Sequence, residues 1–443
     1  MQTRSSILAV LGLFSVLQLP FGPAVRPKNI LPPVASAWTA EPITSNSYAQ
    51  WPAIRGWNKL VYETSTGDVL ILGANNNCEN LFTNALYAYN PVANTYSRRT
   101  WSGSREINGV ENRCSPSNVY NSTGSRFTDY GCGPAPCPVP ATHPGDRHQY
   151  WSAAYDSTRN RLWQLAGLES SSSCLGTGPG TCGYQDTWYY ATTNVEQPAG
   201  TGWVLTCDGI PQPPNPQQPC LAGPGPRQES AMDYDPDDDL VMVYGGLVGG
   251  NPTGDVWFLN PSVGTWTDIC GTQKKICPGG PGPRAANGFV YIGGHQFLFF
   301  GGYNHSRSCV QSITFNDTWI YNVTSRTWTN MNPSGAPPLL SPCTTQTPQS
   351  YPRYPMITYD SKRNAVWYHT GNPNTSQMDW RYDVTGNTWT LASFTGGPIW
   401  AAGTSQNSIS LVYDPAIDAL IGKNGAPVNG FTQMFQLSLV GVN

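Results

Sequence analysis

The stretch that decides the fold is residues 227–267, RQESAMDYDPDDDLVMVYGGLVGGNPTGDVWFLNPSVGTWT, because residues 284–329 repeat its landmarks in the same order. Each copy has Arg after Gly-Pro, then a Gly-Gly pair, an Asp-x-Trp triplet and a final Thr-Trp-Thr. The arginines lie 57 residues apart, the glycine pairs 56 and both tryptophans 62, so a loop of variable length follows the glycines. A repeat of this length is typical of a stacked or circular array.

Each copy predicts four short antiparallel strands. The runs 240–244 and 296–300 are too short and too apolar for an amphipathic helix, and each ends on Gly-Gly, where positive φ or close backbone approach is possible. We interpret them as buried second strands. The Asp-x-Trp segment, the turn 260–264 and the Thr-Trp-Thr segment then predict a hairpin.

Four more units follow the pattern with less fidelity. The first is predicted at residues 55–101, the second at 147–206, the fifth at 353–391, and the sixth begins near residue 401 and lacks one strand at the end of the chain. Trp38 precedes Arg55 by 17 residues, much as Trp266 precedes Arg284 by 18. We therefore expect an N-terminal strand near Trp38 to complete the sixth unit and to remove an open sheet edge.

The glycine pair, the Asp-x-Trp triplet and the second tryptophan nine residues later resemble the kelch repeat, a four-stranded propeller blade. The resemblance covers residues 34–441 and implies an all-β, six-bladed kelch-type β-propeller whose last blade is closed by an N-terminal strand. We predict one domain, residues 34–443.

Residues 1–24 have the pattern of a secretory signal peptide, with Arg4 before an apolar run of thirteen residues that is too short to span a bilayer. Cleavage is expected between residues 24 and 37, and a position near Ala24 leaves the N-terminal strand its length. No second apolar span follows, so we expect an extracellular protein without a membrane span. The net charge is −3 and only 12% of residues are charged, which argues against a nucleic-acid partner.

Twelve cysteines in a secreted chain predict up to six disulfides, although spacing alone cannot fix the pairing. Neighbours in sequence suggest pairs within Cys132 and Cys137, Cys174 and Cys182, Cys207 and Cys220, and Cys270 and Cys277, with Cys78–Cys114 and Cys309–Cys343 possible for the rest. Zinc is the alternative, but no ligand spacing supports it, and no metal or cofactor is predicted.

All twelve cysteines are predicted in the second-to-third and interblade connections, which leave an up-and-down blade on the same face. Long stapled connections on a rigid scaffold are typical of binding surfaces, although the staples could instead only protect against proteolysis. Five Asn-x-Ser/Thr sequons are candidates for glycosylation: Asn121, Asn304, Asn316, Asn322 and Asn374.

Arginines recur at the predicted start of first strands, namely Arg55, Arg147, Arg227, Arg284 and Arg353. Around a ring they could form an anion-binding channel mouth. We favour a structural role in which each pairs with backbone carbonyls or an acid of the adjacent blade. The acidic run from Asp233 to Asp239 suggests calcium, but it lacks the central Gly and distal Glu of a calcium loop, so a solvated turn is favoured.

These features predict a secreted, disulfide-stapled glycoprotein that acts as a binding or extracellular assembly module, with a protein, a glycan or another copy of itself as partner. The alternative is a secreted carbohydrate-active enzyme or an oxidase, because kelch propellers also form the body of galactose oxidase. That resemblance would require a copper site with two Tyr and two His and a further C-terminal domain. We identify no catalytic residue and do not expect an enzyme.

Overall fold

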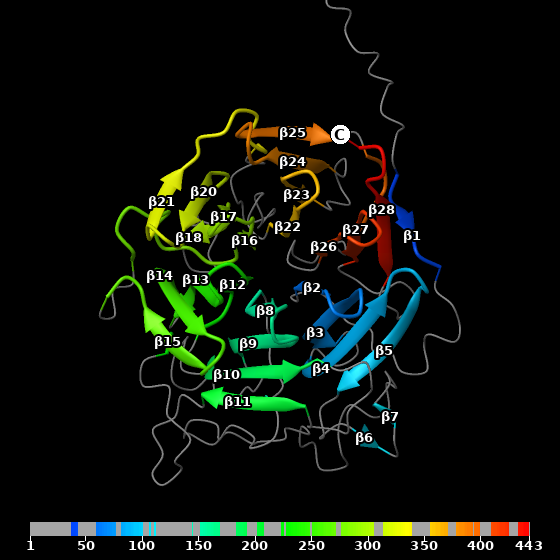
Figure 1. Ribbon diagram of the computed structural model, residues 1–443, viewed down its shortest axis with the longest axis horizontal. Coiled ribbons are helices and arrows are strands. Elements are labelled where there is room, and N and C mark those ends of the chain that lie inside the picture. Colours follow the sequence, from blue (N-terminus) through cyan, green and yellow to red (C-terminus); the bar gives the residue numbers. More distant parts are fainter. Residues whose placement is uncertain are drawn as a thin grey trace, which may run out of the picture. The chain divides into compact units, whose positions relative to one another are not determined.

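Six antiparallel sheets of four strands each form a ring in the computed structural model of the chain (Figure 1). The all-β, six-bladed propeller predicted from the repeats is confirmed. The ring lies within one compact unit, residues Ala35–Asn443. The structure describes residues 37–42, 59–76, 81–100, 106–107, 110–111, 144, 151–168, 183–192, 202–207, 223–225, 227–248, 250–271, 276–304, 313–338, 355–370, 378–392, 394–398, 409–424 and 433–442.

The first strand of each blade lies nearest the centre of the ring (Figure 1). Each contacts the first strands of both neighbouring blades, and the last contacts the first, so the ring is closed. Strands enclosed in this way are mostly buried on both faces. From blade one to blade six they are β2 (Leu60–Glu63), β8 (Ala153–Asp156), β12 (Ala231–Asp235), β16 (Gly288–Tyr291), β22 (Ile357–Asp360) and β26 (Ser410–Asp414).

The second strands carry the apolar runs seen in the sequence, and their side chains fill the space between blades. Tyr244, for example, packs edge-to-face on Phe299 and Trp328 of the next blade. Such aromatic contacts bury large areas and stabilise the seams. The second strands are β3 (Asp68–Asn76), β9 (Arg161–Leu168), β13 (Leu240–Val248), β17 (Gln296–Phe300), β23 (Ala365–His369) and β27 (Ala419–Lys423).

The third and fourth strands form the outer pair of each blade, and the fourth strands are largely exposed or half-buried. The third strands are β4 (Leu81–Asn90), β10 (Gly183–Ala191), β14 (Asn251–Asn260), β20 (Thr318–Asn322), β24 (Asp379–Asp383) and β28 (Met434–Ser438). The fourth strands are β5 (Thr95–Thr100), β11 (Trp203–Cys207), β15 (Thr265–Asp268), β21 (Thr327–Asn330), β25 (Thr388–Ala392) and β1 (Thr39–Ala40).

Two short hairpins were not predicted: β6 (Glu106–Ile107) with β7 (Val110–Glu111), and β18 (Tyr303–Asn304) with β19 (Ile313–Thr314). Two-residue strands carry no hydrophobic period long enough to read from the sequence.

The glycine pair permits close contact between neighbouring blades. Gly245 has φ of 58°, and a Cβ there would lie 2.5 Å from the carbonyl oxygen of Arg284. The amide of Gly246 donates to that same oxygen at 2.9 Å. A larger residue would push blade four away from blade three.

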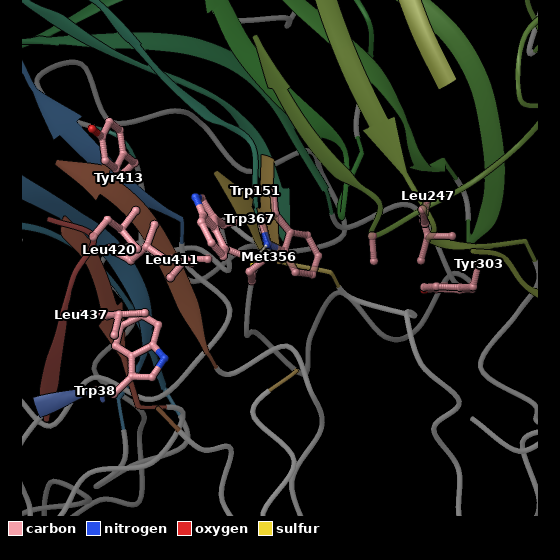
Figure 2. Packing of buried hydrophobic residues seen from close by; sticks show 13 residues of the cluster. Trp38, Trp151, Leu247, Tyr303, Met356, Trp367, Leu411, Tyr413, Leu420 and Leu437 are labelled. Carbon is pink, nitrogen blue, oxygen red and sulfur yellow. Dashed lines mark hydrogen bonds between the residues drawn. The ribbon is translucent and has the colours of Figure 1, made fainter. Parts of the chain in front are cut away.

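Blade six combines strands from both ends of the chain. Strand β1 pairs antiparallel with β28, with Thr39 opposite Gln436 and Ala40 opposite Phe435. Trp38, just before β1, is buried, and its amide donates to the carbonyl of Thr395 at 2.9 Å. Figure 2 shows its indole near Leu437, in the cluster that extends to Trp151 and Met356.

Candidate functional site

Arg227 precedes β12 and is almost fully buried. Its Nε donates to the carbonyl of Pro224 at 2.9 Å, and one terminal nitrogen donates to the carbonyl of Gly245 at 2.9 Å. The guanidinium also forms a two-pronged pair with Asp255, at 3.1 and 2.9 Å. A fork of this kind is the strongest common ion-pair geometry. It ties the segment before β12 to β13 and β14 of the same blade.

The Asp-x-Trp triplet completes this network. Asp255 also accepts from the indole Nε1 of Trp257 at 2.6 Å and from the hydroxyl of Thr253 at 2.9 Å. Burial alone would raise the pKa of Asp255, but Arg227 and these donors outweigh it and hold the pKa below its usual value. The same indole-to-carboxylate bond recurs between Trp188 and Asp186 at 2.6 Å and between Trp319 and Asp317 at 2.8 Å.

Arg284 repeats the arrangement in blade four. It donates to the carbonyls of Pro281 at 3.0 Å and Gly301 at 3.2 Å, and it pairs with both carboxylate oxygens of Asp317. Both arginines thus donate to backbone carbonyls, as expected, whereas the acid that each one pairs with belongs to its own blade and not to the adjacent one. Arg227 and Arg284 therefore hold the scaffold together. Arg55, Arg147 and Arg353 lie outside the described residues.

The first strands surround a small cavity with room for about one water molecule. Residues in or just before the first strands of five blades line it, among them Lys59, Met232, Asn287 and Met356. The ammonium of Lys59 reaches across blade two to the carbonyl of Met232 at 2.7 Å and to Asp233 at 3.1 Å. The indole of Trp151 donates to the sulfur of Met356, and Figure 2 shows the two side by side. These contacts join first-strand segments of different blades around the cavity.

The turns between first and second strands form a second polar system. In blade two, Arg159 pairs with Asp156 of its own turn at 3.1 Å and with Asp239 of blade three at 2.5 Å. In blade five, Arg363 pairs with Asp360 at 3.0 Å and with Asp418 of blade six at 2.7 Å. The guanidinium bonds hold the pKa values of both Asp239 and Asp418 below the usual range. Each arginine thus links two neighbouring blades.

Blade three has no arginine at the corresponding turn position, where Asp238 stands instead. Asp238 lies 2.8 Å from Nδ1 of His295, which occupies the last turn position of blade four. A carboxylate oxygen of Asp235, one of Asp238 and a ring nitrogen of His295 lie within 4.8 Å of one another. The sequence-based interpretation of residues 233–239 as a solvated turn did not include this histidine, which lies 57 residues from Asp238.

A buried histidine joins blade five to the segment before β1. Nδ1 of His369 lies 2.8 Å from Asp379, and Nε2 lies 2.8 Å from the carbonyl of Pro398. Burial alone would lower the pKa of His369, but these two acceptors outweigh it and raise the pKa. Asp379 also accepts from the indole of Trp38 at 3.1 Å. The imidazolium form satisfies both acceptors and fixes Trp38 in place.

Lys423 ends β27 and is fully buried, and its ammonium donates to the carbonyl of Asn424 at 3.0 Å. Strand alternation places Lys423 on the same side of β27 as Ala419 and Ile421, which pack with blade-one residues. Burial lowers the pKa of Lys423 to about 7. The seam between blades six and one thus contains a group that titrates near neutral pH.

We expect Lys423→Met to raise the free energy of unfolding at pH 6 by a few kcal/mol, since one unit of pKa is worth about 1.4 kcal/mol. The folded pKa of about 7 lies below the ordinary 10.5, so the unfolded chain binds the proton more tightly. The free energy of unfolding of the wild type therefore increases as the pH rises from about 7 to 10.5. The gain from methionine should therefore shrink over that interval. Denaturant unfolding at several pH values measures it, with Lys362→Met as an exposed control. A gain independent of pH would contradict the prediction.

The structure joins Cys270 to Cys277 by a disulfide, with Cα atoms 5.0 Å apart. Cys207 ends strand β11, although it was expected in the connection that follows. The other nine lie outside the described residues: Cys78, Cys114, Cys132, Cys137, Cys174, Cys182, Cys220, Cys309 and Cys343.

Of the sequon asparagines, Asn304 ends β18 and Asn322 ends β20, and both are half-buried. The side-chain nitrogen of Asn316 donates to the carbonyl of Pro337 at 2.9 Å. Asn121 and Asn374 lie outside the described residues.

No helix among the described residues is long and apolar enough to cross a membrane. No protein-family model matches the chain.

Proposed function

We propose that the protein is a secreted binding module in which a rigid propeller scaffold presents long connecting segments to an extracellular protein or glycan. The observation that carries the proposal is the strand topology. In every sheet the strands are antiparallel and follow the ring outward, so interblade and second-to-third connections leave from the same edge. The three longest connections, residues 101–152, 331–356 and 208–230, are all interblade and so belong to that edge.

The ion pairs of the described scaffold support this proposal, because the charged side chains that form them hold the blades together. Arg227, Arg284, Arg159 and Arg363 each make ion pairs within or between blades. The short turns at the opposite edge are filled by such bonds. Connections on a rigid scaffold are the usual place for recognition. We therefore propose a binding function and not a catalytic one.

Secretion and glycosylation are part of the proposal. The signal-like residues 1–24, the five sequons and the Cys270–Cys277 disulfide support an extracellular setting. We also propose that the propeller is of the kelch type, because the Gly-Gly and Asp-x-Trp landmarks of that repeat have defined roles at Gly245 and Asp255.

A loop replacement tests the function. The chain would be secreted from a eukaryotic host and screened against a glycan array and a panel of extracellular matrix proteins. Replacing residues 112–143 by a Gly-Ser linker should weaken the binding found by at least about tenfold, because the proposal assigns the partner contacts to this connection. Lys362→Glu, in an exposed turn at the other edge, should leave binding unchanged.

Two outcomes would contradict the proposal: an intact protein that binds none of these partners, or binding that survives loop replacement and is lost with Lys362→Glu. Native mass measurement in the same preparation identifies self-association. Polymers that dissolve when residues 25–40 are deleted would make another copy of the chain the partner, through exchange of β1.

A further inference from the structure

The turn between β12 and β13 lacks a positive charge that the matching turns of blades two and five contain. In those blades the carboxylate that ends the first strand, Asp156 or Asp360, receives an arginine three residues later. In blade three the corresponding carboxylate is Asp235, and the residue three positions later is Asp238, a second acid. Two carboxylates thus stand where blades two and five have a carboxylate and a guanidinium.

Asp235 is fully buried and only half satisfied. Its Oδ1 accepts the amides of Asp237 at 2.8 Å and Asp238 at 3.1 Å. Its Oδ2 is buried without a hydrogen-bond partner. A buried carboxylate oxygen without a partner is costly, and such atoms usually have a ligand, an ion or a water molecule beside them.

The neighbouring groups complete a set of metal ligands. His295 reaches the site from the β16–β17 turn of blade four, with Nδ1 at 2.8 Å from Oδ2 of Asp238. The ligand atoms of Asp235, Asp238 and His295 lie within 4.8 Å of one another. Ligands about 2.1 Å from a tetrahedral zinc ion lie about 3.4 Å from one another. Small movements of Asp238 and His295, whose side chains are 28% and 45% exposed, would bring all three into range.

We infer that Asp235, Asp238 and His295 bind one divalent metal ion of the Zn²⁺ class. Two carboxylates with an imidazole favour such an ion over Ca²⁺ or Mg²⁺, which prefer oxygen ligands alone. The exposed side of the turn leaves room for water to complete the coordination. The bound metal joins blades three and four as Arg159 joins blades two and three, and Arg363 joins blades five and six.

Calorimetric titration of ZnCl₂ into the EDTA-dialysed, full-length mature protein tests the inference, together with the melting temperature. We expect binding with a stoichiometry of roughly one and a zinc-dependent rise in melting temperature, because a ligand of the native state stabilises it. Asp235→Asn and His295→Gln should each weaken zinc binding at least about tenfold. Asp237→Asn is the matched acidic control and should bind zinc like the wild type.

A double variant, Asp238→Arg with His295→Asp, copies the charges of blades two and five. It should lose the zinc response and have a melting temperature that EDTA does not change. The inference is wrong if the wild type shows no heat or melting shift with zinc, or if the Asp235→Asn, His295→Gln and double variants bind zinc like the wild type. Binding of CaCl₂ in preference to ZnCl₂ would overturn the assigned class of ion. The exposed His295→Gln change keeps the test valid if the buried Asp235→Asn change prevents folding.

Discussion

Arg227→Ala should lower the free energy of unfolding by about 3–5 kcal/mol, the usual effect of removing one partner of a buried ion pair. The variant leaves Asp255 buried with only its Trp257 and Thr253 donors. It also leaves the carbonyls of Pro224 and Gly245 without the guanidinium. Urea unfolding of the full chain, followed by tryptophan fluorescence, measures the loss.

The double variant Arg227→Met with Asp255→Leu is the matched control, since replacing both partners by apolar residues removes the uncompensated charge. Its loss should be clearly smaller than that of the single variant. The pKa of Asp255 is depressed, so the wild-type contribution is complete above the ordinary value of about 3.9 and is lost as the pH falls through the folded pKa. The difference in free energy of unfolding between the wild type and Arg227→Ala should therefore shrink as the pH falls through the same range. Equal losses in the two variants would contradict the structural role of the pair.

Trp38→Ala should cost about 3–5 kcal/mol, the range for truncating a buried aromatic side chain. The indole packs edge-to-face on His369, with ring centroids 5.4 Å apart, and donates to Asp379. Losing it leaves a cavity beside His369 and frees the segment that leads into β1. Hydrogen exchange should then show faster exchange in β28, whose outer edge β1 covers.

Trp38→Phe separates packing from hydrogen bonding. It keeps much of the buried ring and removes the bond to Asp379, so we expect a loss of about 1–2 kcal/mol and near-normal protection of β28. If Trp38→Ala unfolds like the wild type, with unchanged exchange in β28, the segment before β1 does not support blade six.

The repeat landmarks could be found from the sequence because each has a local physical cause. Gly245 and Gly246 permit a close approach to blade four, and Asp255 binds the indole of Trp257 two residues later. The arginine partner could not be found in this way. Arg227 and Asp255 are 28 residues apart, whereas Arg284 and Asp317 are 33 apart, because loop length varies between the copies. No fixed spacing therefore marked the pair.

The three proposed metal ligands, Asp235, Asp238 and His295, could not be predicted together from the sequence for a related reason. Asp238 and His295 lie one repeat apart, in equivalent turns of neighbouring blades, and a scan for ligands along one segment cannot bring them together. Aligning the turns would have supplied the signal, because Asp238 takes the place of Arg159 and Arg363. The contact between Trp38, His369 and Asp379 had no such signal. Trp38 and Asp379, which share a hydrogen bond, are 341 residues apart in the sequence.

The claim that one chain closes its own ring, and so acts as a self-contained scaffold, can be tested with a designed disulfide between β1 and β28. Ala40 faces Phe435, next to the pair in which the amide of Glu41 donates to the carbonyl of Met434. Ala40 and Phe435 therefore form a non-hydrogen-bonded pair of the antiparallel ladder. Cα atoms of such a pair are about 4.5 Å apart, which is within the range that a disulfide can span. Ala40→Cys with Phe435→Cys should form the 40–435 link in a particle of one chain's mass, shown by native mass measurement and peptide mapping. A 40–435 link found in dimers or polymers, absent from monomers, would contradict closure within one chain.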